Sequence, residues 1–324
     1  MFNYLRTHRD SALMLGALLL LIAALLRPTI PLKHNIYSYM LVADITQSMN
    51  TEDMKINGKK ASRMIYMEKM MHEIVASLPC GTKVSLAPFA GVSVAPLYNP
   101  IEVCDNYAVI QETIDHLDWR MAWSGNSRIR DSVLSIARSI RSFPEPAQVV
   151  YFTDGEEAPH LHVFNTRDLT GFQGADSWLF VGIGSLDGAA IPKYSEKNQL
   201  IGYWANESFA LQPGVAQISE QNIGTRNETV ADGTDDRFIA KLDEEYLKSL
   251  TKEIGADYVR GDNLQSVLHA MSLQKPARRD VAPFGIHWIL ALLGGLILLS
   301  AYIPKQPLGV LRHRLMLFKS KPQP

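Results

Sequence analysis

Two short segments carry acidic and hydroxyl side chains in a pattern that suits a hard divalent cation. Asp44, Thr46 and Ser48 alternate directly after an apolar run, and Asp154 follows a second apolar run. Carboxylate and hydroxyl oxygens are ligands of such cations. Where a strand turns into a loop, this alternation can direct one carboxylate and two hydroxyls to a single point. Asp, Ser and Thr are also common helix-cap and turn residues. The pattern therefore indicates a metal site only if the surrounding elements bring these side chains together.

Those elements predict an α/β domain. The second half of the run 36–44 is continuously apolar, as expected of a strand buried on both faces of a parallel sheet, and 148–152 is predicted to be another buried strand. Further strands are predicted over 82–90, 92–97, 177–184 and 257–260, and helices over 61–78, 106–117, 128–143, 242–254 and 263–273. This order indicates a mostly parallel central sheet with helices on both faces. Sites form beyond the carboxyl ends of such strands, which selects the loops after Asp44 and Phe152.

A third loop and two irregular stretches complete this region. Ser127 precedes the helix predicted over 128–143, where it is either a ligand or the N-cap, and Ser124 lies close by. Residues 51–60 are predicted to form a polar loop. The stretch 185–236 is polar and rich in glycine, and we expect an irregular insertion with a hairpin around 200–204 and an extended piece around 209–218.

At this level the chain resembles the von Willebrand factor type A domain. The metal-ion-dependent adhesion site of that family uses an Asp-x-Ser-x-Ser loop, a Thr from a second loop and an Asp from a third. Here Thr46 replaces the first Ser and Ser127 replaces the Thr, while Thr-Asp-Gly-Glu at 153–156 matches the third loop. The resemblance implies a divalent cation, Mg²⁺ before Ca²⁺ or Mn²⁺, held by Asp44, Thr46, Ser48, Ser127 and Asp154. An open position on the metal would bind the carboxylate of an acidic protein partner.

The two cysteines indicate a compartment. Cys80 and Cys104 flank the strands predicted over 82–90 and 92–97, which Gly91 separates. If these strands form a hairpin, both cysteines lie near its open end and can form a disulfide. A disulfide favours an oxidising, extracytoplasmic compartment. Two reduced, buried thiols are the alternative.

Two apolar runs at opposite ends of the chain approach the length of a bilayer span. Residues 12–26 and 286–303 contain no acid, lysine or arginine. We expect transmembrane helices over 12–32 and 285–303, with a cleaved signal peptide or a buried core helix as alternatives. The tails 1–11 and 304–324 are basic and are predicted to be cytoplasmic. The α/β domain over 33–275 and a linker over 276–284 then lie outside.

With these ends, the chain resembles the bacterial BatA and BatB membrane proteins. The resemblance includes Leu-Asp-Glu-Glu-Tyr-Leu at 242–247 and Gly-Ala-Asp-Tyr-Val-Arg at 255–260. Those proteins are encoded beside MoxR-type AAA ATPases, and related members accompany methanol dehydrogenase operons; the segment 117–123 and the paired cysteines are most similar to that branch. This implies an inner-membrane protein whose periplasmic domain assists the assembly or maturation of a client such as methanol dehydrogenase, with a MoxR-type ATPase on the cytoplasmic side. Adhesion to an acidic extracellular ligand is the alternative.

Other classes of function are less favoured. A net charge of -1 and a pI near 6.8 give no reason to expect a nucleic acid partner. A hydrolytic metal centre would use Asp154, Glu156 and Glu157 beside His160 and His162. The sequence contains no His-Glu-x-x-His motif, nucleophile elbow or phosphate-binding loop, so we expect a binding protein and no catalysis.

Overall fold

The computed structural model describes residues 9–163, 166–195, 197–209 and 228–301. The chain divides into two compact units, one of residues 35–279 and one of residues 1–34 with 280–324. The first corresponds closely to the α/β domain predicted over 33–275.

A seven-stranded sheet forms the centre of the 35–279 unit. Its spatial order is β14 (Asp257–Arg260), β9 (Trp178–Gly182), β8 (Gln148–Thr153), β2 (Ser38–Asp44), β5 (Lys83–Ala90) and β6 (Ser93–Val94), with β7 (Ile101–Glu102) also paired to β5. The first five strands are parallel, and β6 and β7 run antiparallel to β5. Every residue of β2 and β8 is buried, which accounts for their continuous apolar sequences. Ala43 pairs with Phe152, so Asp44 and Asp154 leave the sheet at one edge.

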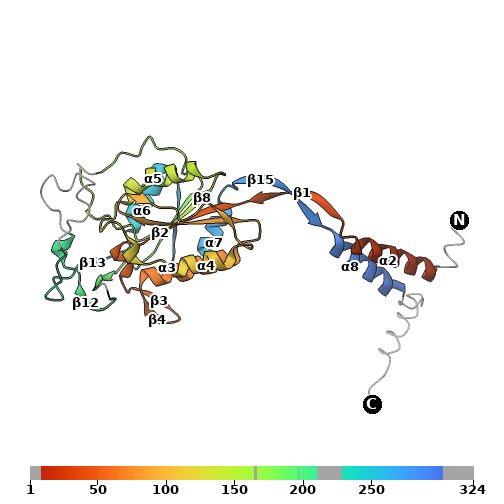
Figure 1. The fold of residues 1–324 in the computed structure, drawn as a ribbon, viewed down its shortest axis with the longest axis horizontal. Helices are drawn as coiled ribbons and strands as arrows, with labels where there is room; N and C mark the ends of the chain where they lie inside the picture. Colours follow the sequence, from red (N-terminus) through yellow and green to blue (C-terminus); the bar gives the residue numbers. More distant parts are fainter. Residues whose placement is uncertain (1–8, 164–165, 196, 210–227, 302–324) are drawn as a thin grey trace, which may run out of the picture. The chain divides into compact units, whose positions relative to one another are not determined.

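Helices cover both faces of this sheet (Figure 1), as predicted. One face packs against α3 (Arg63–Ser77), α4 (Tyr107–Asp115) and α7 (Leu264–Leu273), and the other against α5 (Ile129–Ser142) and α6 (Glu244–Ile254). The apolar residues at helical spacing lie in these two cores. Met67 and Met71 of α3, for example, are fully buried. Short 3₁₀ helices follow β2 and α4: η1 (Gln47–Asn50) and η2 (Trp119–Met121).

The irregular insertion contains short strands. The predicted hairpin around 200–204 is confirmed, since β12 (Leu200–Tyr203) pairs with β11 (Pro192–Tyr194). Nearby, β10 (Ala189–Ala190) pairs with β13 (Ile239–Ala240), and η3 (Asn206–Ser208) follows β12. Most of the extended piece predicted around 209–218 lies outside the described residues. The predicted polar loop over 51–60 is instead a hairpin of β3 (Met54–Ile56) and β4 (Lys59–Ala61).

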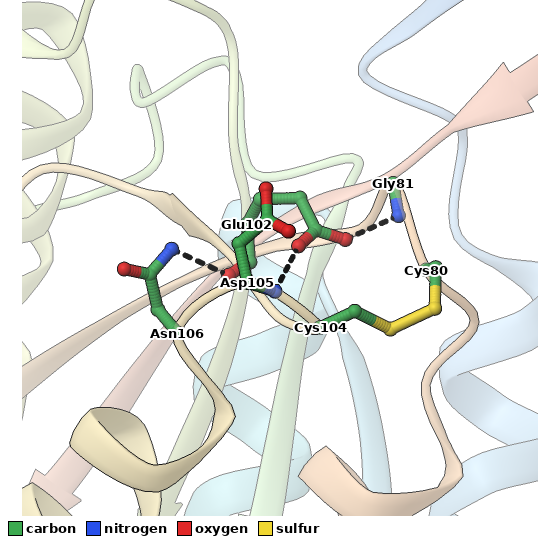
Figure 2. Close-up of a disulfide and its surroundings, with 6 residues drawn as sticks. All are labelled: Cys80, Gly81, Glu102, Cys104, Asp105 and Asn106. Carbon is green, nitrogen blue, oxygen red and sulfur yellow. Dashed lines mark hydrogen bonds between the residues drawn. A yellow bond between two sulfur atoms is a disulfide. The ribbon is translucent and has the colours of Figure 1, made fainter.

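The predicted disulfide is present (Figure 2). The Cα atoms of Cys80 and Cys104 lie 5.3 Å apart. The strand predicted over 92–97 is wrong beyond Val94, where β6 ends. The start of β5 pairs instead with β7, and this pairing brings Cys104 to Cys80. The Glu102 carboxylate accepts hydrogen bonds from the backbone N–H groups of Gly81 and Asp105, at 2.5 and 2.6 Å, and these hydrogen bonds lower its pKa. The disulfide and Glu102 thus hold the start of β5 beside β7.

Replacing both cysteines by alanine is expected to lower the free energy of unfolding by about 3 kcal/mol. The bond joins residues 24 positions apart, and a loop of this length restricts the unfolded chain by about that amount in the chain-entropy model. Urea unfolding of the double variant, compared with the oxidised wild type, measures the difference. Wild type treated with dithiothreitol should match the variant, and equal stability of all three would contradict the prediction.

The second unit holds the two terminal apolar helices. α2 (Arg9–Leu25) packs against α8 (His287–Ala301), and β1 (Thr29–Ile36) pairs with β15 (Arg278–Gly285). The helix predicted over 12–32 is therefore wrong at its end, and most of the predicted linker over 276–284 is strand. Pro28 favours an end to the helix, and its carbonyl accepts a hydrogen bond from Ile286 N at 3.0 Å. Searched over the described residues, no helix has both the length and the apolar character needed to cross a bilayer.

Candidate metal centre

Three of the predicted ligands come together where β2 ends. Asp44 is fully buried, and its Oδ1 accepts hydrogen bonds from Thr46 N at 3.0 Å and Thr46 Oγ1 at 2.6 Å. Its Oδ2 accepts from Thr153 Oγ1 at 2.7 Å, and Thr46 Oγ1 lies 3.3 Å from Ser48 Oγ. Thr46 is the N-cap residue of η1 but makes no side-chain capping bond. The alternation of acid and hydroxyls thus gathers oxygens instead of capping the helix.

Ser127 provides a third hydroxyl from the loop before α5. Its backbone exchanges hydrogen bonds with Ala158 at 2.9 and 2.7 Å, which holds the loop in place. The cap position of α5 is Arg128, so the interpretation of Ser127 as the N-cap is wrong. Ser124 Oγ accepts from Asn126 N at 3.1 Å, which engages it within its own loop. The Ser127 side chain is buried, and its Oγ has no hydrogen-bond partner among the described residues.

A small pocket joins these hydroxyls. It has a volume of about 10 Å³, close to the room that one water molecule needs. Its lining consists of Thr46, Gln47, Ser48, Gly125, Ser127, Glu156, Ala158 and Phe209. A buried hydroxyl without a partner costs about 1–3 kcal/mol, so the unpartnered Ser127 Oγ calls for a ligand. A divalent cation would satisfy it, because the other donors at this point are also hard oxygens.

Asp154 lies close enough to Asp44 to affect its pKa, and both carboxylates lie outside the lining of this pocket. Asp154 is fully buried; its Oδ1 accepts from Glu156 N at 3.0 Å, and its Oδ2 accepts from Arg63 Nη1 at 2.8 Å. Burial, followed by the charge of Asp154, raises the pKa of Asp44 to about 7. Two buried carboxylates so close together favour a bound cation, which would compensate their repulsion.

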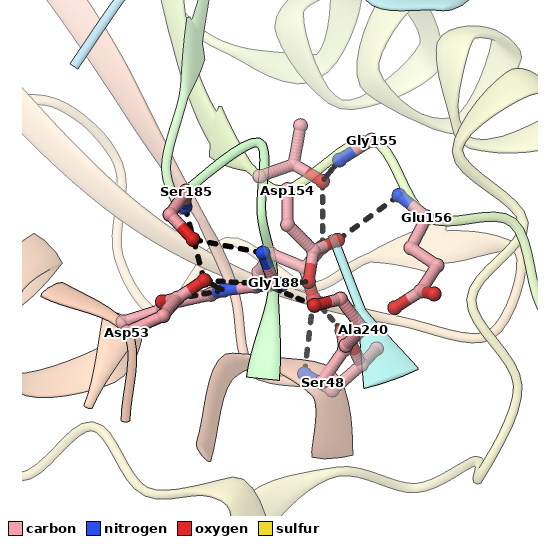
Figure 3. A network of polar contacts seen from close by, with 12 residues as sticks. Ser48, Asp53, Asp154, Gly155, Glu156, Ser185, Gly188 and Ala240 are labelled. Carbon is pink, nitrogen blue, oxygen red and sulfur yellow. Dashed lines mark hydrogen bonds and ion pairs between the residues drawn. The ribbon is translucent and has the colours of Figure 1, made fainter. Parts of the chain in front are cut away.

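Arg63 is a residue of this centre that the sequence did not indicate. It is the first residue of α3 and is fully buried. Besides Asp154, its guanidinium donates to Asp53 at 2.7 and 3.0 Å and to the carbonyl of Ala240 at 2.9 Å. Figure 3 shows Asp53, Asp154 and Ala240 around this network, together with Ser185, whose N–H donates to Asp53 at 3.0 Å. The Arg63 side chain thus connects the loop after β8 with two other segments, those of Asp53 and Ala240.

Two glycines allow these close approaches. Gly184 has φ +134°, and a Cβ there would lie 2.8 Å from Arg63 Nε. Gly155 has φ +80°, and a Cβ would lie 2.8 Å from Leu247 Cγ. Any other side chain would strain the backbone and displace a neighbour. The Gly-Ile-Gly and Asp-Gly-Glu segments therefore have steric reasons for their glycines.

Glu157 ties the same loop to the second helical layer. It is 6% exposed, and its Oε1 accepts from Tyr246 Oη at 2.6 Å and Arg130 N at 2.8 Å. Burial raises the pKa of Glu157 to about 7. Asp243 N also donates to Asp154 O at 2.8 Å. The loop after β8 is thus fixed by both α5 and α6.

Replacing Glu157 by glutamine is expected to change how stability depends on pH. The pKa of Glu157 is near 7 in the folded chain and about 4.5 in the unfolded chain, so the folded state binds more protons between these values. Its contribution to stability is therefore lost as pH rises from about 4.5 to 7. The variant should gain stability relative to wild type over this range, by at most about 1.4 kcal/mol per pH unit. Urea unfolding at pH 5, 6 and 7 measures the difference, and the partly exposed Glu73→Gln serves as control; parallel profiles would contradict the assignment.

The residues of the competing hydrolytic centre do not form a histidine-containing cluster here. In the part of the chain that the structure describes, one group of three His, Cys, Asp or Glu side chains has ligand atoms within 4.8 Å of one another. It consists of Cys80, Glu102 and Cys104, whose two sulfurs are already joined to each other. Among the described residues, His160 and His162 thus form no such group with Asp154, Glu156 or Glu157.

The chain is similar to a known family over part of its length and to several solved structures. Residues 39–157 match the family model described as the von Willebrand factor type A domain. No curated protein matches the chain. Among solved structures, similarity is found to an aerotolerance-related membrane protein from Bacteroides fragilis, with 19% identity over 74% of this chain and 98% of that one and a TM-score of 0.48. BatB from Bacteroides thetaiotaomicron has 17% identity over 73% and 97%, with a TM-score of 0.48.

The residues matched by the family model include each of the five predicted ligands. They also include β2 from Tyr39 onward, β8 and the loop before α5, which position those ligands. The α/β fold of residues 39–157 is therefore similar to that of a von Willebrand factor type A domain.

Proposed function

We propose that this chain is a membrane-anchored protein-binding module whose partner docks through a divalent cation. The observation that carries the proposal is the pocket in which the unpartnered, buried Ser127 Oγ adjoins Thr46 and Ser48, beside the buried carboxylate of Asp44. Few charged protein groups would bind a metal there. One coordination position of the metal would therefore remain open for a carboxylate of the partner. The proposal requires binding and no catalysis.

Thr46, Ser48 and Ser127 would hold the cation, with Mg²⁺ before Ca²⁺ or Mn²⁺. The bound cation would supply a positive point at which an acidic side chain is recognised. Asp44 and Asp154 would contribute mainly their charge, because hydrogen bonds already engage both oxygens of each carboxylate and neither lines the pocket. The sequence-based expectation made all five residues ligands.

The remaining features support a setting for this module. The disulfide supports an oxidising compartment such as the periplasm. The terminal apolar segments and basic tails support two membrane anchors with cytoplasmic ends. Within the proposal, the domain assists assembly or maturation of a periplasmic enzyme, such as metal insertion into methanol dehydrogenase, and a MoxR-type AAA ATPase acts from the cytoplasmic side.

Affinity purification of the full chain from membranes tests this proposal. A periplasmic client should be retained in Mg²⁺ and lost in EDTA, and Ser127→Ala should lose it in both. Ser142→Ala should retain it, because the exposed Ser142 bonds within its own helix and lines neither cavity. The ATPase should be recovered regardless of metal if it contacts the cytoplasmic tails. Equal recovery of the client in Mg²⁺ and EDTA would contradict metal-dependent docking. Recovery of neither protein would favour the adhesion alternative.

A further inference from the structure

We propose that a cleft beside the metal pocket is the second half of the partner site and selects an acidic peptide segment that carries a large apolar side chain near its carboxylate. This inference rests on the proposed metal-dependent docking. It adds the class of ligand that the site recognises.

The cleft adjoins the metal pocket. It has a volume of about 490 Å³, within the range of ligand-binding pockets. Its lining consists of Gln47, Trp119, Arg120, Ala122, Trp123, Ser124, Gly125, Lys193, Tyr194, Trp204 and Glu228. Gln47 and Gly125 line both cavities. The segment 119–127 therefore supplies aromatic walls to one cavity and the Ser127 hydroxyl to the other.

Aromatic rings dominate the walls of the cleft. Trp119 stacks on Tyr194 with ring centroids 6.5 Å apart, and the Lys193 ammonium lies 4.3 Å from the ring centroid of Trp204. These contacts fix three of the rings, while Trp123 remains 45% exposed. Rigid aromatic rings with polar edges provide large contact areas at low entropic cost, which is why they are enriched at binding surfaces. The cleft thus offers a preformed surface for an apolar side chain.

A bound cation would make the metal pocket the point that binds an acidic group. The charges of the cleft itself are balanced, because Arg120 pairs with Asp118 at 2.8 Å and Lys193 with Glu228 at 3.5 Å. Glu156 lines the metal pocket and Asp44 is buried beside it, so a divalent cation would first compensate these carboxylates. Its open coordination position would then bind a carboxylate of the peptide.

One extended peptide can occupy both cavities. When a carboxylate of the peptide enters the metal pocket, the neighbouring peptide residues would lie over Gln47 and Gly125 and extend toward the aromatic walls. Each extended residue advances about 3.3–3.6 Å, so the acidic and apolar side chains would be separated by few residues. Binding both groups together would give more affinity than the carboxylate alone, because the second contact is made within one ligand.

Capped glycine-based hexapeptides test this inference with the full chain. The three probes contain one aspartate and one phenylalanine separated by one glycine, the aspartate alone, or the phenylalanine alone. Binding is measured by saturation-transfer NMR in Mg²⁺ and in EDTA. We expect the peptide with both groups to bind about tenfold more tightly than the aspartate peptide, in Mg²⁺ only. Trp123→Ala should remove this difference while the affinity for Mg²⁺ stays unchanged.

Met121→Ala is the matched control, because Met121 belongs to η2 and is 41% exposed but does not line the cleft. It should keep the tenfold difference. If the two acidic peptides bind equally in Mg²⁺, or if Trp123→Ala keeps the difference, the cleft is not part of the site while metal-dependent docking stands. If the aspartate peptide binds equally in EDTA, the proposed function fails, and this inference fails with it.

Discussion

Replacing Asp44 by asparagine is expected to weaken the binding of Mg²⁺ to the full chain by about 100-fold or more. Asp44 is fully buried and accepts a hydrogen bond from Thr46 Oγ1, which lies 3.3 Å from Ser48 Oγ. A unit charge a few Å from a cation contributes several kcal/mol at the effective dielectric of a protein, and each 1.4 kcal/mol changes affinity tenfold. Isothermal titration with Mg²⁺ at pH 8 measures the loss.

The stability of the same variant should change in the opposite direction. Because burial raises the pKa of Asp44, the ionised carboxylate destabilises the metal-free fold at pH 8. Metal-free Asp44→Asn should therefore be at least as stable as wild type, which separates loss of the site from misfolding. Asp168→Asn, which removes an exposed carboxylate that is hydrogen-bonded to Thr170 in its own turn, should bind Mg²⁺ like wild type. Equal affinity in Asp44→Asn and wild type would exclude a metal site at this position.

Replacing Arg63 by methionine is expected to cost about 3–5 kcal/mol of stability. The guanidinium is fully buried between Asp53 and Asp154, so its removal leaves two buried carboxylates without a counter-ion. Urea unfolding of the metal-free chain measures the cost. Arg120→Met is the matched control, since Arg120 also pairs with an aspartate at 2.8 Å but is exposed. It should change stability little, because exposed pairs contribute little.

Mg²⁺ should stabilise Arg63→Met more than it stabilises wild type. Without the arginine, Asp154 Oδ2 loses its cationic partner, and a divalent cation nearby would compensate its charge instead. Melting temperatures with and without Mg²⁺ measure this second effect. If Arg63→Met is as stable as wild type and responds equally to Mg²⁺, the buried network does not balance the charge of the centre.

Much of the domain could be predicted because it follows from local patterns. Continuous apolar runs marked β2 and β8 as buried strands, and helical spacing marked the five helices of the domain within a few residues. The end of a parallel strand is also a local property, so the positions of Asp44 and Asp154 at one sheet edge could be predicted. The Asn57-Gly58 turn between β3 and β4 was a readable hairpin signal that the prediction of a polar loop overlooked.

Tertiary structure decided the contacts between residues far apart in the chain. Arg63 reaches Asp154 across 91 positions, and no periodicity of α3 distinguishes it from a solvent-exposed arginine. The orphaned hydroxyl of Ser127, and the engagement of Asp154 by Arg63, likewise depend on loops that meet only in the folded chain. The sequence by itself therefore determined which edge of the sheet carries the oxygens. Packing decided which of them can face a cation, because burial and partner geometry are set by elements distant in sequence.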